Sequence, residues 1–383
     1  MVERSSVEDV RVDVVVIGMG QAGLSAAYHL GRRGFEPDER MLLLDANPGP
    51  GGAWQHRWPS LTLKTANGVA DLPGWGLREA IDVDDEVPAA TTVARYYAAY
   101  EERMGLGVLR PVTVDRVEQP DGVGTDFVLT LSGDGRPADT VRARAIVNAT
   151  GTWDRPRIPY YRGIASFEGR QLHTRDYTRA EDFAGSHVLV VGAGISAVQH
   201  LGELAQVTRT SWVSRSRPDI RDAEFTPEVG TDVVARVAER VRQGLPPGSV
   251  VSNTGLPIAA VSSDALPRCR PMFDRIDRAG VVWDPEVPRA WGAVPEDGRL
   301  DVDVFLWATG FIHRLDHLAP LDLRTPEGGL LVDGRATTRA VENHGVHLPG
   351  YGPSASTIGA NRAGRAIARE LDDYLAGQDF HPR

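Results

Sequence analysis

Two short apolar runs rich in β-branched residues each lead directly into a glycine-rich turn and then into a helical pattern. The first run covers residues 12–17 and precedes a turn at 18–23 and an alanine-rich pattern that predicts a helix over about 21–34. The second run covers 186–191 and precedes a turn at 192–197. A buried parallel strand followed by such a turn and a helix is the setting in which a G-x-G-x-x-G motif binds a dinucleotide. The pattern therefore predicts two dinucleotide sites.

The small residues of both turns have separate physical roles. In the first turn, Gly18 permits the tight bend, Gly20 lets the backbone approach a pyrophosphate, and Gly23 lets the helix pack close to the strand. The phosphates are then expected on unpaired N–H groups at the start of the helix. The second turn supplies Gly192, Gly194, Ser196 and Ala197 for the same purpose, with alanine as the third small residue.

The residues that follow the next strand of each unit differ in charge. The apolar run over residues 41–44 is followed directly by Asp45. This carboxylate is expected to accept a hydrogen bond from a ribose 2′-hydroxyl and to repel a 2′-phosphate. The strand predicted over residues 210–213 is followed instead by Ser214, Arg215, Ser216 and Arg217. The guanidinium groups of the two arginines fit a 2′-phosphate. Arginines on loops are often only solvated, but at this offset from a glycine motif they favour NADPH. The two sites together predict bound FAD and visiting NADPH, between which a hydride passes.

Three further segments are expected to face the cofactors. Gly51, Gly52 and Trp54 lie in a Gly/Pro-rich loop and predict a flavin-ring contact, with a solvated turn as the alternative. The strand ending Ala-Thr150-Gly151 recurs as Ala-Thr-Gly310, which suggests two crossings between modules. The loop over 348–360 opens the last helix, so the N–H groups of Thr357 and Ile358 can face an electron-rich ring edge, or the helix is simply capped.

The fold class expected from this order is α/β, with two Rossmann-like dinucleotide-binding domains in a glutathione-reductase-like arrangement. Residues 1–158 and 300–383 are assigned to a discontinuous FAD-binding domain, and 159–299 to an NADPH-binding domain with an insertion. Residues 218–299 show few clear secondary-structure patterns, and their aromatic side chains are expected in a core. Other predicted elements are a helix over 91–104 capped by Thr91 or Thr92, a strand over 108–117, a hairpin of 127–131 with 140–144, a return strand over 145–151, and helices over 233–241 and 358–376.

Composition excludes several classes of protein. The 383-residue chain carries 52 acidic and 42 basic residues, a net charge of −10, which argues against binding to nucleic acid or to an anionic membrane. No apolar run reaches the length of a membrane helix and the first residues do not resemble a signal peptide, so a cytoplasmic location is expected. Cys269 is the only cysteine, which excludes an intramolecular disulfide and a C-x-x-C pair. No metal site is predicted, and the oligomeric state stays open, a homodimer being one option.

Between the two glycine motifs, Phe167, Gly169, His173 and Tyr177 match F-x-G-x-x-x-H-x-x-x-(Y/F). This resembles the fingerprint of the flavin-containing monooxygenases among the class B flavoprotein monooxygenases, and the chain is similar to their soluble bacterial branch. The resemblance implies FAD as a bound cofactor and NADPH and O2 as co-substrates. It also implies a carbon-4a (hydro)peroxyflavin that transfers one oxygen atom to a soft nucleophile, a small sulfide or amine.

The resemblance also implies a catalytic set of His173, Tyr177 and Asn67. His173 is expected to position NADP⁺ or to couple domain motion to turnover, although it can instead satisfy only backbone carbonyls. Asn67 is expected near the flavin, or as a turn residue before Gly68. Tyr177 stands where Baeyer-Villiger members typically carry tryptophan, which favours S- or N-oxygenation over oxygenation of ketones. The sequence also leaves open a flavin reductase without oxygen transfer, whose common disulfide form lacks its C-x-x-C here, and a flavin-binding protein without turnover.

Overall fold

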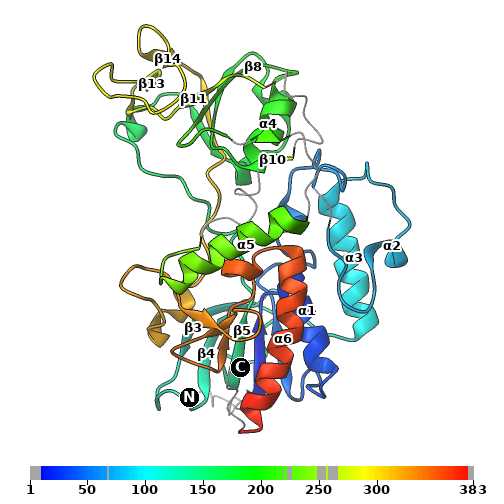
Figure 1. Ribbon diagram of the computed structural model, residues 1–383. Coiled ribbons are helices and arrows are strands. Elements are labelled where there is room, and N and C mark those ends of the chain that lie inside the picture. The colour runs from blue at the N-terminus through cyan, green and yellow to red at the C-terminus, as the bar shows by residue number, and fades with distance from the viewer. Residues whose placement is uncertain are drawn as a thin grey trace, which may run out of the picture.

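The computed structural model describes residues 10–66, 69–218, 220–221, 227–247, 256–257 and 266–377. Two α/β domains lie one above the other and are joined by extended segments (Figure 1). The first domain contains both ends of the described chain, and the second is inserted between them. This arrangement confirms the predicted fold class of two Rossmann-like domains.

The first domain is built on one mixed sheet. Its parallel centre has the order β18-β5-β1-β2, and an antiparallel edge and a hairpin extend it. In β1 and its two neighbours the carboxyl ends are level, because Ile17 pairs with Leu44 on one side and with Asn148 on the other. The strands are β1 (Val10–Ile17), β2 (Met41–Leu44), β3 (Thr113–Glu118), β4 (Phe127–Ser132), β5 (Thr140–Asn148), β16 (Val332–Asp333), β17 (Arg339–Ala340) and β18 (Val346–His347).

Helices cover the first sheet. Helix α1 (Gln21–Gly31) packs against α6 (Thr357–Leu375), with α3 (Ala89–Met104) and the short α2 (Leu77–Ala80) to one side (Figure 1). Alternate residues of β1 divide between the two faces of the sheet: Val14 and Val16 face the core with α1 and α6, and Val15 faces the core with the β3–β4 hairpin. Burial on both faces explains the continuous apolar run of β1.

The second domain repeats this plan with a fully parallel sheet in the order β11-β8-β7-β15-β6. Trp283 is fully buried in its core, as expected for an aromatic residue of the 218–299 stretch, whereas Trp291 is only partly buried and belongs to no core cluster. The elements are β6 (Arg170–His173), β7 (His187–Val191), α4 (Ile195–Leu204), β8 (Arg209–Ser214), β11 (Cys269–Pro271) and β15 (Val304–Trp307), with a small antiparallel sheet of β12 (Arg275–Ile276), β13 (Gly280–Val282) and β14 (Arg299–Asp301), and a parallel pair of β9 (Ile220–Arg221) and β10 (Leu256–Pro257).

Helix α5 (Pro227–Arg242) is longer than the predicted 233–241 and lies over the first domain (Figure 1). Val241 is fully buried there with Leu348 and Tyr351. Its residues fall within the range assigned to the second domain from the sequence, and no sequence pattern indicates this packing. The domain boundaries themselves stay a prediction.

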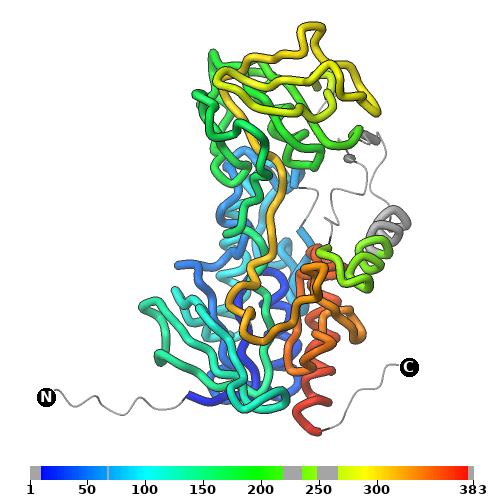
Figure 2. Tube along the Cα trace, turned by 90° about the vertical axis from the view of Figure 1, so that its left-hand side faces the viewer, coloured from blue at the N-terminus to red at the C-terminus, as the bar shows by residue number. Residues whose placement is uncertain are grey.

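Two segments, residues 149–157 and 308–314, cross between the domains side by side (Figure 2). They pair as antiparallel chains: the N–H of Arg157 donates to the Gly310 carbonyl at 3.0 Å, and the N–H of Arg314 donates to that of Gly151 at 3.1 Å. Each crossing begins at the carboxyl end of a central strand, β5 or β15. The predicted crossings at the two Ala-Thr-Gly sequences are therefore present, and the carboxyl ends of both sheets face the space between the domains.

Four further local predictions differ from the structure. Helix α3 begins at Ala89 after Pro88 and not at a threonine cap, because the Ala89 N–H donates to the Leu61 carbonyl at 2.8 Å. The strand predicted over 108–117 is shorter, at Thr113–Glu118. Residues predicted as a hairpin arm and a separate return strand form the single strand β5, whose burial changes from alternating to continuous as it enters the middle of the sheet. The predicted helix over 21–34 ends at Gly31, and α6 matches its prediction within one residue at each end.

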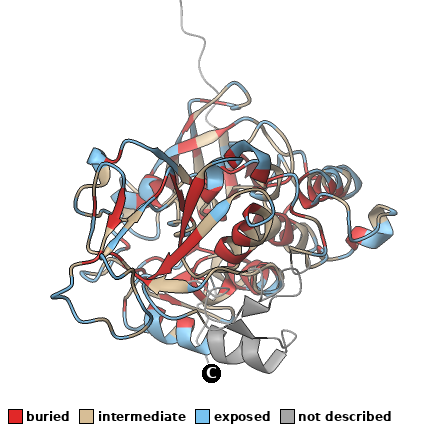
Figure 3. Ribbon diagram, turned by 90° about the horizontal axis from the view of Figure 1, so that it is seen from above, coloured by how far each residue is buried: buried red, intermediate tan, exposed pale blue. Residues whose placement is uncertain are grey.

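Buried residues lie along the central strands and on the inner helix faces, and exposed residues lie on the outer loops (Figure 3). One core cluster is continuous between the domains, since it contains Trp58 and Leu61 of the first and Leu201 of the second, together with Tyr177. Among the described helices, none combines the length and the apolar character that a membrane crossing requires. The described residues contain no cluster of side chains able to hold a metal ion.

Candidate functional site

The first glycine turn is packed too closely to accept a side chain. Gly18 has φ +92°, and a Cβ added there would lie 2.6 Å from the carbonyl oxygen of Ala149. Gly52 has φ +52°, and a Cβ added there would lie 2.7 Å from the Cα of Gly20. A Cβ at Gly23 would overlap the Gly18 carbonyl, so the helix needs glycine to pack on the turn. The Gly18–Gly23 turn and the Gly51–Trp54 loop thus meet backbone to backbone, as expected of a dinucleotide cradle.

Two helix N-termini lie together beside this turn. Gly20 precedes α1 and provides no side-chain cap, and the first turn of α1 contains no acidic residue. The side-chain amide of Gln21 donates to Asn361 Oδ1 of α6 at 2.9 Å, which holds the two helix starts side by side. In α6, Ser356 caps only the N–H of Gly359, and Ile358 remains 57% exposed. Uncapped N–H groups at the α1 start fit a pyrophosphate.

Asp45 is buried at the carboxyl end of β2. Its Oδ1 accepts hydrogen bonds from the Asn47 N–H at 3.1 Å and from the Asn47 side-chain amide at 3.0 Å. Its Oδ2 lies 3.3 Å from a guanidinium nitrogen of Arg110, which also forms a bidentate ion pair with Glu101. These contacts fix the carboxylate, and its oxygens keep lone pairs with which to accept from a ribose. Its role toward a ribose stays a prediction.

The second turn repeats the geometry of the first. Gly192 has φ +141°, and a Cβ there would overlap the carbonyl oxygen of Ala308, the counterpart of Ala149. Gly194 precedes α4 without a side-chain cap, and the first turn of α4, with Ser196 and the buried Ala197, contains no acidic residue. This second helix start is therefore also free to receive a phosphate.

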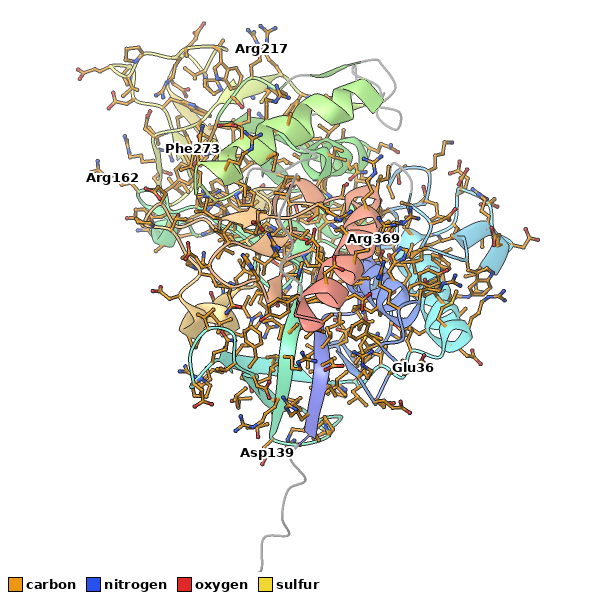
Figure 4. The ribbon with its side chains drawn as sticks, turned by 60° about the horizontal axis from the view of Figure 1, so that its bottom comes forward. Glu36, Asp139, Arg162, Arg217, Phe273 and Arg369 are labelled. Atoms are coloured by element: carbon orange, nitrogen blue, oxygen red, sulfur yellow. The ribbon has the colours of Figure 1, made fainter. Side chains whose placement is uncertain are left out.

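The arginines predicted to hold a 2′-phosphate follow β8 directly. Ser214 is buried and its hydroxyl donates to the Ser216 carbonyl at 2.5 Å, which closes the turn after the strand. Arg215 and Arg217 are exposed, and neither forms a hydrogen bond or ion pair with another described residue. In Figure 4, the side chain of Arg217 points outward, away from the rest of the protein. Both guanidinium groups are thus available to a ligand, and Arg215 is the nearer to the strand end.

His173 is buried at the end of β6 and uses both ring nitrogens within the protein. Its Nε2 lies 2.9 Å from the Gly310 carbonyl, to which it donates, and its Nδ1 accepts from the Arg175 N–H at 3.1 Å. Burial lowers the pKa of this imidazole, so it is neutral at pH 7. With no nitrogen left to accept a proton, His173 is suited to holding the crossing segment at Gly310. Its action on NADP⁺ stays a prediction.

Rings connect the Gly51–Trp54 loop to His173. Arg57 follows this loop, and its guanidinium lies 4.8 Å from the ring centroid of Trp153 and 6.0 Å from that of Trp54. Trp153 stacks on Phe311 at 5.1 Å, and Phe311 contacts the His173 ring edge to face at 4.9 Å. Burial lowers the pKa of Arg57 to about 10. The structure thereby connects Trp54 and His173 through a continuous series of contacts along the crossing segments. Asn67 lies outside the described residues.

Tyr177 takes part in a contact between the domains that the sequence does not indicate. We refer to this contact, formed by Glu203 with Trp58, Ser60 and Tyr177, as the interdomain clasp. Glu203, on α4, accepts hydrogen bonds from three donors: Trp58 Nε1 at 3.0 Å, the Ser60 hydroxyl at 2.9 Å and the Tyr177 hydroxyl at 2.7 Å. Trp58 and Ser60 belong to the first domain, so one carboxylate of the second domain fixes a loop of the first. Tyr177 is buried at this contact and is a positioning residue here, while its predicted catalytic role is untested.

Replacing Glu203 by alanine is expected to lower the free energy of unfolding by about 2–4 kcal/mol, because two buried donors, on Trp58 and Tyr177, lose their acceptor. Glu203→Gln keeps one acceptor oxygen and should lose roughly half as much. Urea unfolding followed by tryptophan fluorescence measures both. Glu102→Ala, an exposed glutamate on α3, is the control. Equal stability of the Glu203 and Glu102 variants would show that the clasp contributes nothing.

His200 packs against the interdomain clasp, and its burial predicts that the protein loses stability as the pH falls. It is fully buried, packs on Trp58 at 4.6 Å and on Tyr177 at 4.2 Å, and neither ring nitrogen has a hydrogen-bond partner among the described residues. Burial lowers its pKa to about 3. Only the unfolded chain then takes up this proton between pH 6.5 and 3, so the stability present above pH 6.5 is lost as the pH falls.

Between pH 8 and pH 5, His200 is expected to lower the free energy of unfolding by about 2 kcal/mol, because pH 5 lies about 1.5 units below the pKa of a histidine in the unfolded chain. His200→Leu should remove that part of the pH dependence of unfolding, measured by urea titrations at both pH values. His344→Leu, at an exposed site, should leave the pH dependence as it is. An unchanged slope in His200→Leu would contradict the assignment.

Comparison with known proteins agrees with this geometry. The profile of a family described as pyridine nucleotide-disulphide oxidoreductase matches residues 15–256. The structure of a flavin-containing monooxygenase from Stenotrophomonas maltophilia is similar with a TM-score of 0.75 and 34% identity, over 96% of this chain and 99% of that one. The uncharacterized oxidoreductase CzcO of Bacillus velezensis is 27% identical over 54% of this chain and 55% of its own length. Indole-3-pyruvate monooxygenase YUCCA1 of Oryza sativa is 30% identical over 48% of this chain and 43% of its own length.

The chain thus spans about half the length of the curated relatives it matches, but almost the whole of the bacterial structure. The profile match includes both glycine turns and the clasp helix α4.

Proposed function

Since the chain belongs to the pyridine nucleotide-disulphide oxidoreductase family and, within it, to the flavin-containing monooxygenases, we propose that it is an FAD- and NADPH-dependent monooxygenase. It transfers one oxygen atom from O2 to a soft nucleophile, a small sulfide or amine. The second oxygen atom leaves as water, and NADPH supplies the two electrons.

The observation that carries this proposal is that each domain has an uncapped helix start at the carboxyl ends of its parallel strands, and that these ends face each other. Gly20 and Gly194 each precede a helix with no side-chain cap and no acidic residue in its first turn. The crossing segments join the carboxyl ends of β5 and β15, so both helix starts border the space between the domains. Two dinucleotides bound there would direct their reactive rings into one interdomain space.

In this scheme the first domain holds FAD, which supplies the redox and oxygen-activating chemistry when bound. The Gly18–Gly23 turn and the α1 N–H groups hold its pyrophosphate, and Asp45 accepts from its ribose. The backbone of Gly52 allows close approach of the ring. The start of α6, at Thr357 and Ile358, places N–H groups next to that of α1, where they can stabilise negative charge on the ring edge.

The second domain holds NADPH. The Gly192–Ala197 turn and the α4 start hold its pyrophosphate, and Arg215 and Arg217 pair with its 2′-phosphate. We expect the remaining contacts to keep water out: the rings of Trp153 and Phe311, one from each crossing segment, stack on each other, and His173 holds the second segment at Gly310. A dry site of this kind favours oxygen transfer to the substrate over release of hydrogen peroxide.

Disulfide reduction is disfavoured by the only cysteine. Burial raises the pKa of the Cys269 thiol to about 11, so it is not a thiolate at pH 7 and is a poor nucleophile toward a disulfide. Cys269 also lies on β11, at the edge of the second sheet, and no second cysteine exists to resolve a mixed disulfide.

The test supplies the purified yellow protein with NADPH and ¹⁸O2 and offers, in separate reactions, methyl phenyl sulfide, a tertiary amine and cyclohexanone. We expect equal consumption of NADPH and O2 and one ¹⁸O atom in the sulfoxide or the amine oxide. An ¹⁸O-labelled lactone from cyclohexanone alone would favour the Baeyer-Villiger alternative. NADPH oxidation that reduces a quinone or dye and consumes no oxygen would contradict the monooxygenase.

A further inference from the structure

A surface pocket of about 510 Å³ lies between the end of α1 and the outer face of α6. We refer to it as the α1–α6 pocket. Its lining residues come from the two helices and the turn after α1: His29, Arg32, Arg33, Arg365, Ala368, Arg369 and Asp372. In Figure 4, Arg369 lies on α6 near α1.

The charge of the α1–α6 pocket is opposite to that of the protein. Four arginines face one carboxylate, in a chain whose net charge is −10. Arg33 forms an ion pair with Asp372. The side chains of the other three, Arg32, Arg365 and Arg369, form no hydrogen bond or ion pair with the rest of the described chain. The pocket therefore gathers about three uncompensated positive charges.

His29 responds to this concentration of charge. It is half-buried in the same pocket, and burial, followed by repulsion from each of the four arginines, lowers its pKa to about 4. All four arginines line one pocket together with His29, so they are not merely spread over two helix surfaces.

Folding alone does not explain the arrangement. The carboxyl end of α1 carries partial negative charge, which accounts for Arg32 and Arg33. Arg365 and Arg369 are one turn apart in the body of α6, where like charges at i and i+4 cost about 0.2–0.5 kcal/mol. A multivalent anion would offset that repulsion, because several planar guanidinium groups can each donate two hydrogen bonds to its oxygens.

We propose that the α1–α6 pocket is a binding site for a small phosphorylated molecule, a phosphomonoester or a pyrophosphate. Three free guanidinium groups suit an anion with two or more charges better than a single carboxylate, and the pocket has the size of a small-molecule site. It is separate from the FAD cradle: α1 has 11 residues, so its two ends are about 16 Å apart. The proposal does not depend on the proposed function.

The ligand would clamp α1 to α6. Both helices begin at the FAD cradle, where Gln21 and Asn361 already join them. An anion held by Arg32, directly after α1, and by Arg365 and Arg369 of α6 would reinforce the connection that the Arg33–Asp372 ion pair already makes at the opposite end of α1. Binding should therefore raise the thermal stability of the first domain.

The experiment titrates the FAD-loaded protein with inorganic pyrophosphate at constant ionic strength, using sodium chloride as the compensating salt, and follows the melting temperature and the heat of binding. The titration is repeated with Arg215→Ala, in which binding at the predicted 2′-phosphate site would be weakened and binding at the α1–α6 pocket would not. We expect a saturable rise in melting temperature, and at least tenfold weaker binding in the double variant Arg365→Gln/Arg369→Gln. Arg362→Gln, an exposed arginine of α6 outside the pocket, should bind as the unmodified protein does.

Pyrophosphate binding that is absent, or equally strong in the double variant, would overturn the proposal. A parallel sedimentation assay uses vesicles of phosphatidylglycerol and phosphatidylcholine. Vesicle binding that is lost in the double variant, without a response to pyrophosphate, would identify an anionic membrane surface as the ligand and would also overturn the small-molecule assignment.

Discussion

The Gly52→Ala protein is expected to purify with little or no flavin, while the Gly49→Ala protein keeps its full content. The Gly51–Trp54 loop touches the first glycine turn at this point, and the added Cβ would lie 2.7 Å from the Cα of Gly20. Carbon atoms in contact are normally about 3.5–4.0 Å apart, so the two loops must separate. Gly20 is the residue whose backbone is expected to approach the pyrophosphate, and its displacement should abolish tight binding.

Gly49→Ala is the matched control because Gly49 lies two residues before the Gly51–Trp54 loop and nothing stands within 4 Å of its added Cβ. The ratio of visible flavin absorbance to protein absorbance measures the cofactor content. Far-ultraviolet circular dichroism shows whether Gly52→Ala still folds. A folded Gly52→Ala protein with full flavin content would mean that the contact between the two loops does not shape the cofactor site.

The Arg215→Ala protein is expected to have a KM for NADPH raised roughly ten- to hundredfold, with the KM for NADH almost unchanged. Hydrogen bonds to a charged group contribute about 1.5–3 kcal/mol, which corresponds to this range. Arg215 follows the carboxyl end of β8, is exposed, and forms no ion pair within the described structure. Its guanidinium is therefore free to pair with a 2′-phosphate that NADH lacks.

Arg209→Ala is the control for charge alone. Arg209 is exposed at the opposite end of β8, about 20 Å from Arg215. Steady-state oxidation of NADPH and NADH by all three proteins gives the comparison. Equal changes for the two nucleotides in Arg215→Ala would remove the 2′-phosphate assignment and leave the preference for NADPH without support.

Much of the fold is encoded in short stretches and could be predicted. The apolar run of β1, the glycine turn and the start of α1 are determined by residues within about twenty positions of one another, because burial pattern, backbone freedom and helix start are local properties. The same reasoning predicts β7, its turn and α4, and the repeated Ala-Thr-Gly endings predict the two crossings. Where a prediction is wrong, as at the start of α3, a distant backbone contact from Leu61 decides the boundary.

The sequence by itself determined the two dinucleotide turns, the acid and the arginines that follow the next strands, and the α/β class. Only the tertiary structure decided which distant groups meet. Trp58 is 145 positions from Glu203, and Arg33 is 339 positions from Asp372. No periodicity relates such residues, because their contact depends on how strands and helices pack after they form. The interdomain clasp, the packing of α5 on the first domain and the α1–α6 pocket all depend on contacts between such distant residues.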